Sequence, residues 1–225
     1  MDEYVTRHSQ IMDQYDKSKN VALFVDEWGI WTDVEPGTNP GHLFQQNSMR
    51  DALIASNTLD ILNKHCDRVR MANIAQVVNV LQAMILTKGD KMILTPTYYV
   101  FKMYNVHQDA TLLPSSLITE PYRHGDEEIP AISSSASVDK SGKIHVTISN
   151  INPSKEVKLE VNLSGKTIAK INSATILTAQ AFNTVNTFEK PETIVPTAFK
   201  NAKKLTDNKL ELSIPGKSVV VLELE

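Results

Sequence analysis

The segment Val21-Ala-Leu-Phe-Val-Asp-Glu-Trp-Gly-Ile-Trp31 is an apolar run that ends in two adjacent carboxylates and two tryptophans. A continuous apolar run of about five residues, rich in Val and Phe, predicts a strand buried on both faces, as in a parallel sheet covered by helices. Asp26 and Glu27 then stand at the carboxyl end of the strand, where the loops of a (β/α)8 barrel enclose the catalytic groups. Under an alternative interpretation, Asp26 caps the next element and both tryptophans belong to the core.

Helices are predicted on both sides of this strand. Residues 3–16 indicate a helix packed on a sheet, because apolar and aromatic side chains recur there at helical spacing: Tyr4, His8, Ile11 and Tyr15. Ser48 and Asp51 approximate the capping box of a second helix. The apolar stripe of that helix comprises Met49, Ala52, Ala55, Leu59 and Leu62.

A second strand is predicted over residues 68–74, and its carboxyl end brings polar side chains to the face that holds Glu27. These are Asn73, Gln76 and Asn79. Neutral amides at such a place can hydrogen-bond hydroxyl groups. Alternatively, Gln76 and Asn79 satisfy only the loop backbone. Residues 81–94 are expected to form a loop with a turn, and Thr95 followed by Pro96 predicts the start of a helix that runs to residue 107.

The character of the chain changes after Asp109, where strict alternation of apolar and polar residues begins. Residues 143–149 and 157–163 alternate in this way, and Asn150-Ile-Asn-Pro-Ser154 lies between them, so the two strands are expected to form a hairpin with one solvated face. Gly-Lys and Asn-Lys turns recur further on at the spacing of an antiparallel sandwich. Aromatic side chains, which sugar-binding faces use, are few here, chiefly Phe182, Phe188 and Phe199, and there is no tryptophan.

Composition narrows the possible functions. The 225 residues are 41% hydrophobic and 22% charged, which is ordinary for a soluble globular protein. A net charge of -3 without a basic stripe argues against nucleic acid and membrane surfaces as partners and favours neutral ligands such as sugars. The single cysteine, Cys66, excludes an internal disulfide and is expected to be a small buried side chain. No apolar run reaches the ~20 residues of a membrane span, and the first residues lack the layout of a signal peptide.

The segment from Thr32 to Gln46 is dense in Pro, Gly and Asn and predicts a long loop over the end of the first strand. Asp33, Glu35 and His42 lie in this loop, but their spacing matches no pattern of metal ligands. We therefore expect neither a metal nor another cofactor.

The segment Val25-Asp-Glu-Trp-Gly-Ile-Trp31 resembles the nucleophile segment of the family 51 glycoside hydrolases, the retaining α-L-arabinofuranosidases, in which Asp-Glu-Trp-Asn/Gly-x-Trp closes the seventh barrel strand. Asp67–Asn79 resembles the eighth strand of that family, and Leu212–Leu224 resembles its closing strand. The resemblance implies an α/β part followed by an all-β part. Residues 1–108 would form the seventh and eighth strand-helix units of a (β/α)8 TIM barrel, without the first six strands, and residues 109–225 a jelly-roll-like antiparallel β-sandwich.

The same resemblance implies a role for each residue of the segment. Glu27 would be the nucleophile that forms a covalent arabinosyl ester, while the acid/base glutamate has no counterpart in this chain. Trp28 and Trp31 would supply apolar walls for the sugar, and Gln76 would contact it. Asp26 points to the opposite face of the strand and would position rather than react. Gly29 stands where the family often has Asn, a departure that leaves open which substituents of the substrate the pocket accepts.

The substrate implied by the resemblance is an arabinofuranosyl-containing saccharide of hemicellulose or pectin, and homo-oligomers are common in the family. The isolated chain is expected to be inactive, since it lacks the acid/base residue. The rival hypothesis is a non-catalytic carbohydrate-binding or structural β-sandwich module.

Overall fold

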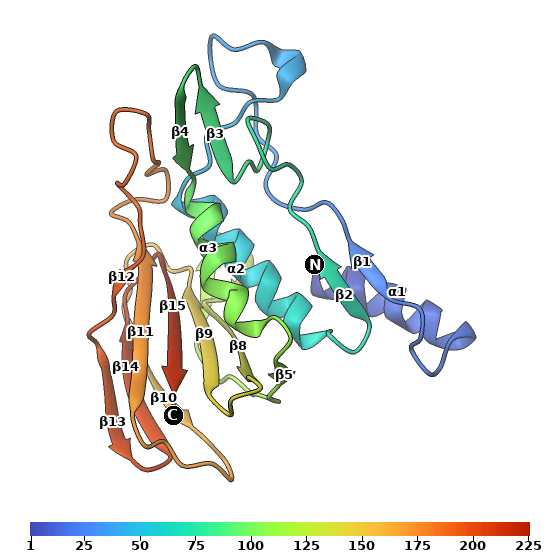
Figure 1. Cartoon of the computed structure of the whole chain (residues 1–225), viewed down its shortest axis with the longest axis vertical. Helices are drawn as coiled ribbons and strands as arrows, with labels where there is room; N and C mark the ends of the chain where they lie inside the picture. The colour runs from blue at the N-terminus through green and yellow to red at the C-terminus, as the bar shows by residue number, and fades with distance from the viewer.

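The computed structural model describes residues 1–225, and its elements fall into a helical part with short strands and a part made of antiparallel sheets (Figure 1). The first part contains α1 (Asp2–Tyr15), β1 (Leu23–Val25), the 3-10 helix η1 (Pro40–His42), α2 (Met49–Lys64), β2 (Val69–Ala72), β3 (Ile85–Lys88), β4 (Lys91–Leu94), α3 (Pro96–Tyr104) and η2 (Asn105–His107). The second contains β5 (Thr111–Leu112), β6 (Pro121–His124), β7 (Glu127–Pro130), β8 (Ile132–Val138), β9 (Ile144–Asn150), β10 (Val157–Asn162), β11 (Ile171–Thr178), β12 (Thr197–Ala198), β13 (Ala202–Thr206), β14 (Lys209–Ile214) and β15 (Ser218–Leu224).

Strands β1 and β2 form a parallel pair connected through α2, which is a single βαβ unit. Leu23 and Val25 point toward the cluster that contains α2. Phe24 and Met71 lie on the other side and are 51% and 44% exposed. The prediction of a strand buried on both faces is therefore wrong for this chain, because only the side facing α2 has a layer packed over it (Figure 1).

Helix α1 confirms the predicted helix, but its predicted apolar stripe lies in solvent. Tyr4, Ile11 and Tyr15 are exposed, and Val5 is the one buried residue. A buried guanidinium holds the helix instead. Arg68, just before β2, pairs with the carboxylates of Asp13 and Asp16 and also donates 2.8 Å hydrogen bonds to the carbonyls of Asp16 and Val21.

The helices α2 and α3 begin where the sequence predicts. The Ser48 and Asp51 side chains complete a capping box at the start of α2, and the Thr95 hydroxyl accepts a hydrogen bond from the Tyr98 amide, with Pro96 at the first helical position. Residues 81–94 differ from the expected loop, since β3 and β4 form a hairpin around Gly89. Four-residue strands carry too little alternation to be recognised in the sequence.

The second part is an antiparallel sandwich, as predicted. Six strands in the order β12-β11-β15-β9-β8-β5 face three in the order β10-β14-β13. Their inner faces share a core whose fully buried members include Ile148, Leu210, Leu212, Ile214 and Leu222.

The predicted hairpin between residues 143–149 and 157–163 is wrong. Strand β9 pairs with β8 and β15, while β10 pairs with β14 in the other sheet. The segment after Asn150 therefore crosses from one sheet to the other. The Asn150 side chain fixes this crossing by donating to the carbonyls of Lys155 and Ile214, each at 3.0 Å. Turn residues mark a reversal of the chain, but they do not determine the strand with which the next one pairs.

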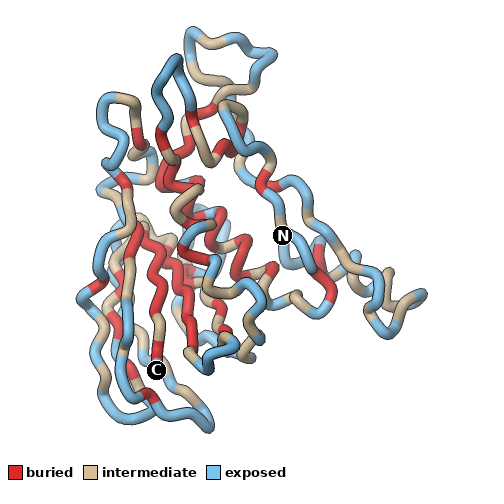
Figure 2. Tube along the Cα trace, viewed as in Figure 1, coloured by how far each residue is buried: buried red, intermediate tan, exposed pale blue.

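The face of the six-stranded sheet that alternation predicts as solvated is covered by α2 and α3, and β9 is buried at all seven positions. Figure 2 shows this burial running through α2 and the central strands of the sheet. Asp60 of α2 lies in the middle of this interface. Its carboxylate accepts hydrogen bonds from Tyr104 (3.0 Å), Ser133 (2.6 Å), Ser135 (2.9 Å) and Thr147 (2.8 Å).

A second hydrophobic cluster joins the two parts of the chain. It includes Ala52 and Leu59 of α2 together with Leu177, Val219 and Val221 of the large sheet. The predicted division into residues 1–108 and 109–225 stays a prediction. The strands of the sandwich begin at β5, near the predicted boundary, but this hydrophobic cluster contains residues of both parts. None of the helices combines the length and the apolar character that crossing a membrane requires.

Candidate active site

The carboxyl ends of β1 and β2 lie side by side because the two strands are parallel (Figure 1). The backbone amide of Asn73 donates to the Val25 carbonyl at 2.9 Å, which extends the pairing to the end of β1. One residue further, the Asn73 side-chain amide donates to the Asp26 carboxylate at 3.0 Å. Asp26 is thus tied to the neighbouring strand. The geometry agrees with a positioning role, which sequence reasoning proposed for Asp26 without identifying Asn73 as its partner.

Glu27 follows as an exposed side chain whose carboxylate takes part in no hydrogen bond or ion pair of the chain. No cation of the chain neutralises it. A carboxylate in this state keeps its lone pairs available for another molecule.

The structure separates the two tryptophans. Trp28 is 7% exposed and stacks on Phe101 of α3, with ring centroids 5.9 Å apart and planes inclined by 15°. Its indole N–H is buried without a hydrogen-bond partner. Trp31 is 65% exposed. The core position predicted by the alternative interpretation is therefore found for Trp28, whereas Trp31 offers an open aromatic face at the end of the segment.

The amide side chains after β2 also differ. Gln76 is exposed and makes no hydrogen bond within the chain. Asn79 instead bonds Thr87 of β3 twice, donating to its hydroxyl and accepting from its backbone amide, both at 2.7 Å. Asn79 is therefore engaged within the chain, although its partner is a residue of strand β3 and not the loop backbone. Gln76 keeps both ends of its amide free.

Two buried glutamines, which sequence reasoning did not single out, hold the chain just after Glu27. Gln82 and Gln45 both donate from their side-chain amides to the Ile30 carbonyl, Gln45 at 3.3 Å, and the Gln45 side-chain oxygen accepts from the Thr32 amide at 3.1 Å. The only sequence signal for this arrangement is Gly29, whose φ of +130° places it in a region that L side chains rarely adopt.

The remaining candidates of the long loop are dispersed. Glu35 accepts from the Gln46 backbone amide at 3.0 Å, and no group of three or more His, Cys, Asp or Glu side chains gathers anywhere in the chain. Cys66 is a free, half-buried thiol.

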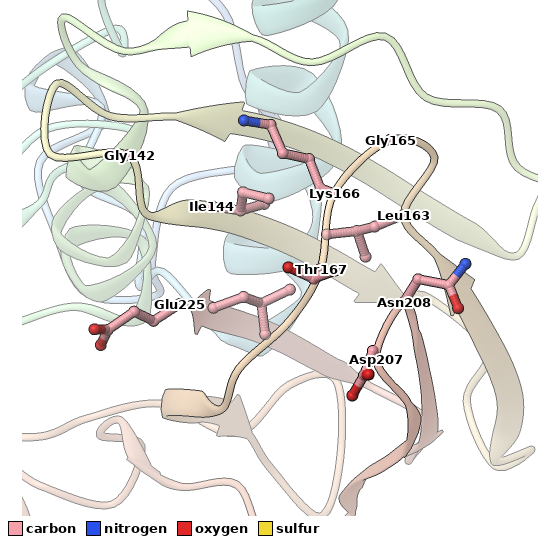
Figure 3. Close-up of a pocket in the computed structure, with 10 residues that line it drawn as sticks. Gly142, Ile144, Leu163, Gly165, Lys166, Thr167, Asp207, Asn208 and Glu225 are labelled. Atoms are coloured by element: carbon pink, nitrogen blue, oxygen red, sulfur yellow. The ribbon is translucent and has the colours of Figure 1, made fainter.

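Two hollows lie away from Glu27. One, of 590 Å³, opens at the end of the sandwich near the C-terminus, and Figure 3 shows its lining drawn from loops and strand ends, with Lys166, Asp207 and Glu225 among them. It has no aromatic side chain on which a sugar ring could stack. The other is a groove of 670 Å³ between β2, α2 and α3, lined among others by Asn73, Phe101 and Tyr104. Only the groove reaches the Asp26–Asn73 pair at the strand ends.

The fold and the site define the class of protein: the C-terminal part of a (β/α)8 barrel, with a free carboxylate at the end of a strand, joined to an antiparallel β-sandwich. Residues 26–218 match the family model described as "Alpha-L-arabinofuranosidase C-terminal domain", and the chain belongs to that family.

Individual relatives agree with this assignment. An intracellular exo-α-L-arabinofuranosidase of Bacteroides ovatus is 49% identical over 226 residues, which are 100% of this chain and 44% of the relative. The crystal structure of a family 51 arabinofuranosidase from Xanthomonas axonopodis pv. citri superposes with a TM-score of 0.97 at 51% identity, over 100% of this chain and 45% of that one. A family 51 α-L-arabinofuranosidase from Bifidobacterium longum gives 0.85 at 25% identity, over 100% and 47%. The resemblance inferred from the sequence is confirmed, and the chain spans less than half the length of each of these relatives.

Proposed function

We propose that this chain is the nucleophile-bearing part of a retaining α-L-arabinofuranosidase, which hydrolyses terminal non-reducing α-L-arabinofuranosyl residues of arabinose-containing polysaccharides or oligosaccharides. The observation that carries the proposal is the state of Glu27: exposed, unpaired and at the carboxyl end of β1. The surrounding chain aligns in full with a family 51 arabinofuranosidase at 51% identity.

In the proposed reaction, the Glu27 carboxylate attacks the anomeric carbon while a second carboxylic acid protonates the departing oxygen. The resulting arabinosyl ester is then hydrolysed by a water molecule that the second group deprotonates, so the anomeric configuration is retained. The two carboxyl groups must stand about 5–5.5 Å apart. Asp26 is adjacent to Glu27 on the strand but is engaged by Asn73, so it suits positioning better than acid catalysis.

The second carboxyl group would come from outside these 225 residues, as the resemblance to the family implies. The isolated chain would then bind and turn over little or no substrate. This inactivity belongs to the proposal and is tested with it.

The substrate contacts follow from exposure. Trp31 presents an open indole, and Gln76 a free amide that can both donate to and accept from sugar hydroxyls. Trp28 is packed against Phe101 and only 7% exposed, so it has little surface left for contact with the sugar. Assembly of the whole protein into homo-oligomers stays a prediction.

The test uses a chimera in which this chain replaces the matched region of the Bacteroides ovatus relative. The chimera should hydrolyse an aryl α-L-arabinofuranoside, and Glu27→Gln should abolish turnover, while Glu127→Gln, an exposed glutamate of β7, should not. A mechanism-based arabinofuranosyl inactivator should label the peptide that contains Glu27. The chain alone should show no turnover with the same substrate. Labelling of another residue, or an active Glu27→Gln chimera, would refute the proposal.

A further inference from the structure

We propose that Gln82 is a positioning residue for the nucleophile segment, acting through the Ile30 carbonyl, and that Gly29 is the residue that leaves room for it. The inference rests on the proposed function of Glu27. It concerns the three residues that connect Glu27 to Trp31, the two exposed residues assigned to the reaction and to substrate contact.

The Gln82 side chain is buried, with 2% of the residue exposed, although it comes from a loop rather than from a helix or strand. Its amide nitrogen donates to the Ile30 carbonyl and lies 3.4 Å from the Asp51 carboxylate. Asp51 is itself fixed, because it accepts from the amide and the hydroxyl of Ser48 at 2.8 Å each, at the start of α2. The nucleophile segment is thereby connected to the amino end of the helix that follows it.

Gly29 fits against this side chain without space to spare. A Cβ atom at position 29 would stand 2.5 Å from Gln82 Cγ and 2.8 Å from its Oε1, closer than real Cβ atoms approach. The φ of +130° adds strain for any other residue. Gly29 and Gln82 therefore form a matched pair: the Gln82 side chain occupies the space that a Cβ atom at position 29 would need.

The Ile30 carbonyl receives a second buried amide, that of Gln45, which also accepts from the Thr32 backbone. Two side chains from distant loops thus converge on one carbonyl, three residues after Glu27 and one before Trp31. Buried amides are costly unless their hydrogen bonds are made, so this convergence restricts the segment to one conformation. Displacement of a reacting group by about 1 Å can lower a rate about 100-fold. Loss of these hydrogen bonds, which would let the segment move, should therefore slow the reaction at Glu27.

The kinetic test is Gln82→Met in the chimera, which keeps the size of the side chain but removes its donor. The kcat for an aryl arabinofuranoside should fall roughly 10- to 100-fold, with KM unchanged within about twofold. Gln46→Met is the matched control, since the Gln46 side chain donates to the Asn186 carbonyl at 2.8 Å and not to the nucleophile segment. It should leave kcat within about twofold of the unsubstituted chimera.

A second test uses the full chain without the added region. Gln82→Met should accelerate hydrogen exchange of the amides in residues 29–32, and Gln46→Met should not. Gly29→Ala should lower the Tm of the chain, and the loss should be smaller in a Gln82→Ala background, because the clash with the Gln82 side chain is then absent.

The outcomes separate the two proposals. Loss of turnover with Glu27→Gln, but unchanged kcat and exchange with Gln82→Met, overturns the positioning role and leaves the proposed function standing. Full activity with Glu27→Gln overturns the proposed function and the positioning role with it. Equal effects of Gly29→Ala in both backgrounds would refute the matched pair.

Discussion

Replacing Asp60 by Asn should remove the pH dependence that this one residue imposes on stability. Asp60 is fully buried where α2 meets the large sheet, and its four hydroxyl donors are neutral. No cation compensates its charge. The nearby His107 ring is hydrogen-bonded to the hydroxyls of Ser137 and Thr147. Burial, reinforced by repulsion from His145, lowers the pKa of His107 to about 4, so this ring is neutral at pH 7.

The magnitude follows from the shift of the Asp60 pKa. Burial, opposed by the hydroxyl hydrogen bonds, raises this pKa from 3.8 to about 6. A shift of this size corresponds to about 3 kcal/mol, at 1.36 kcal/mol for each pH unit. The folded state holds the proton more tightly than the unfolded state, so the contribution is fully present below pH 3.8 and is lost as the pH rises through about 6.

An amide at position 60 does not titrate, so the Asp60→Asn variant lacks this loss. The free energy of unfolding of the variant relative to the unsubstituted chain should rise by about 2 kcal/mol between pH 4.5 and 7.5. The remainder of the about 3 kcal/mol falls below pH 4.5, outside the measured range. Urea unfolding at several pH values measures the difference, in which the other titrating groups cancel. Asp126→Asn, in the exposed turn between β6 and β7, is the control. Parallel stability curves for the unsubstituted chain and Asp60→Asn would refute the reasoning.

Four further substitutions test the packing and the site. Trp28→Ala should lower the free energy of unfolding by about 3–5 kcal/mol, since it opens a cavity against Phe101, and Trp31→Ala should change it by less than about 0.5 kcal/mol while reducing the activity of the chimera. Arg68→Met should lower the free energy of unfolding by about 1–3 kcal/mol in urea, because two carboxylates and two carbonyls lose their donor. Helix α1 should then detach, which faster hydrogen exchange of residues 2–15 would detect. Ser48→Ala should lower the free energy of unfolding by about 1 kcal/mol, because it removes the serine side chain from the capping box. Equal stability of the variant and the unsubstituted chain would contradict this.

The sequence by itself determined the starts of the helices, the presence of a sandwich and the family to which the chain belongs. Capping signals located α2 and α3, because a side chain that caps a helix lies within three residues of the amide it serves. Alternation and turn residues predicted a sandwich, and Val25–Trp31 indicated the family that the comparisons confirm. These features depend on neighbours in the chain, and for that reason the sequence displays them.

Tertiary structure alone decided which faces are buried and which residues support the site. The polar side of β9 looks solvated in the sequence, yet it is covered by a helix that begins 95 positions before the strand, at Met49. Within that helix, Asp60 accepts from the Thr147 hydroxyl and Ser56 accepts from the Ser149 hydroxyl. The two tryptophans, three positions apart, occupy opposite environments because only Trp28 meets Phe101. Gln82 reaches the Ile30 carbonyl across 52 positions. Contacts of such separation depend on how the layers pack against one another, and local periodicity carries no information about that packing.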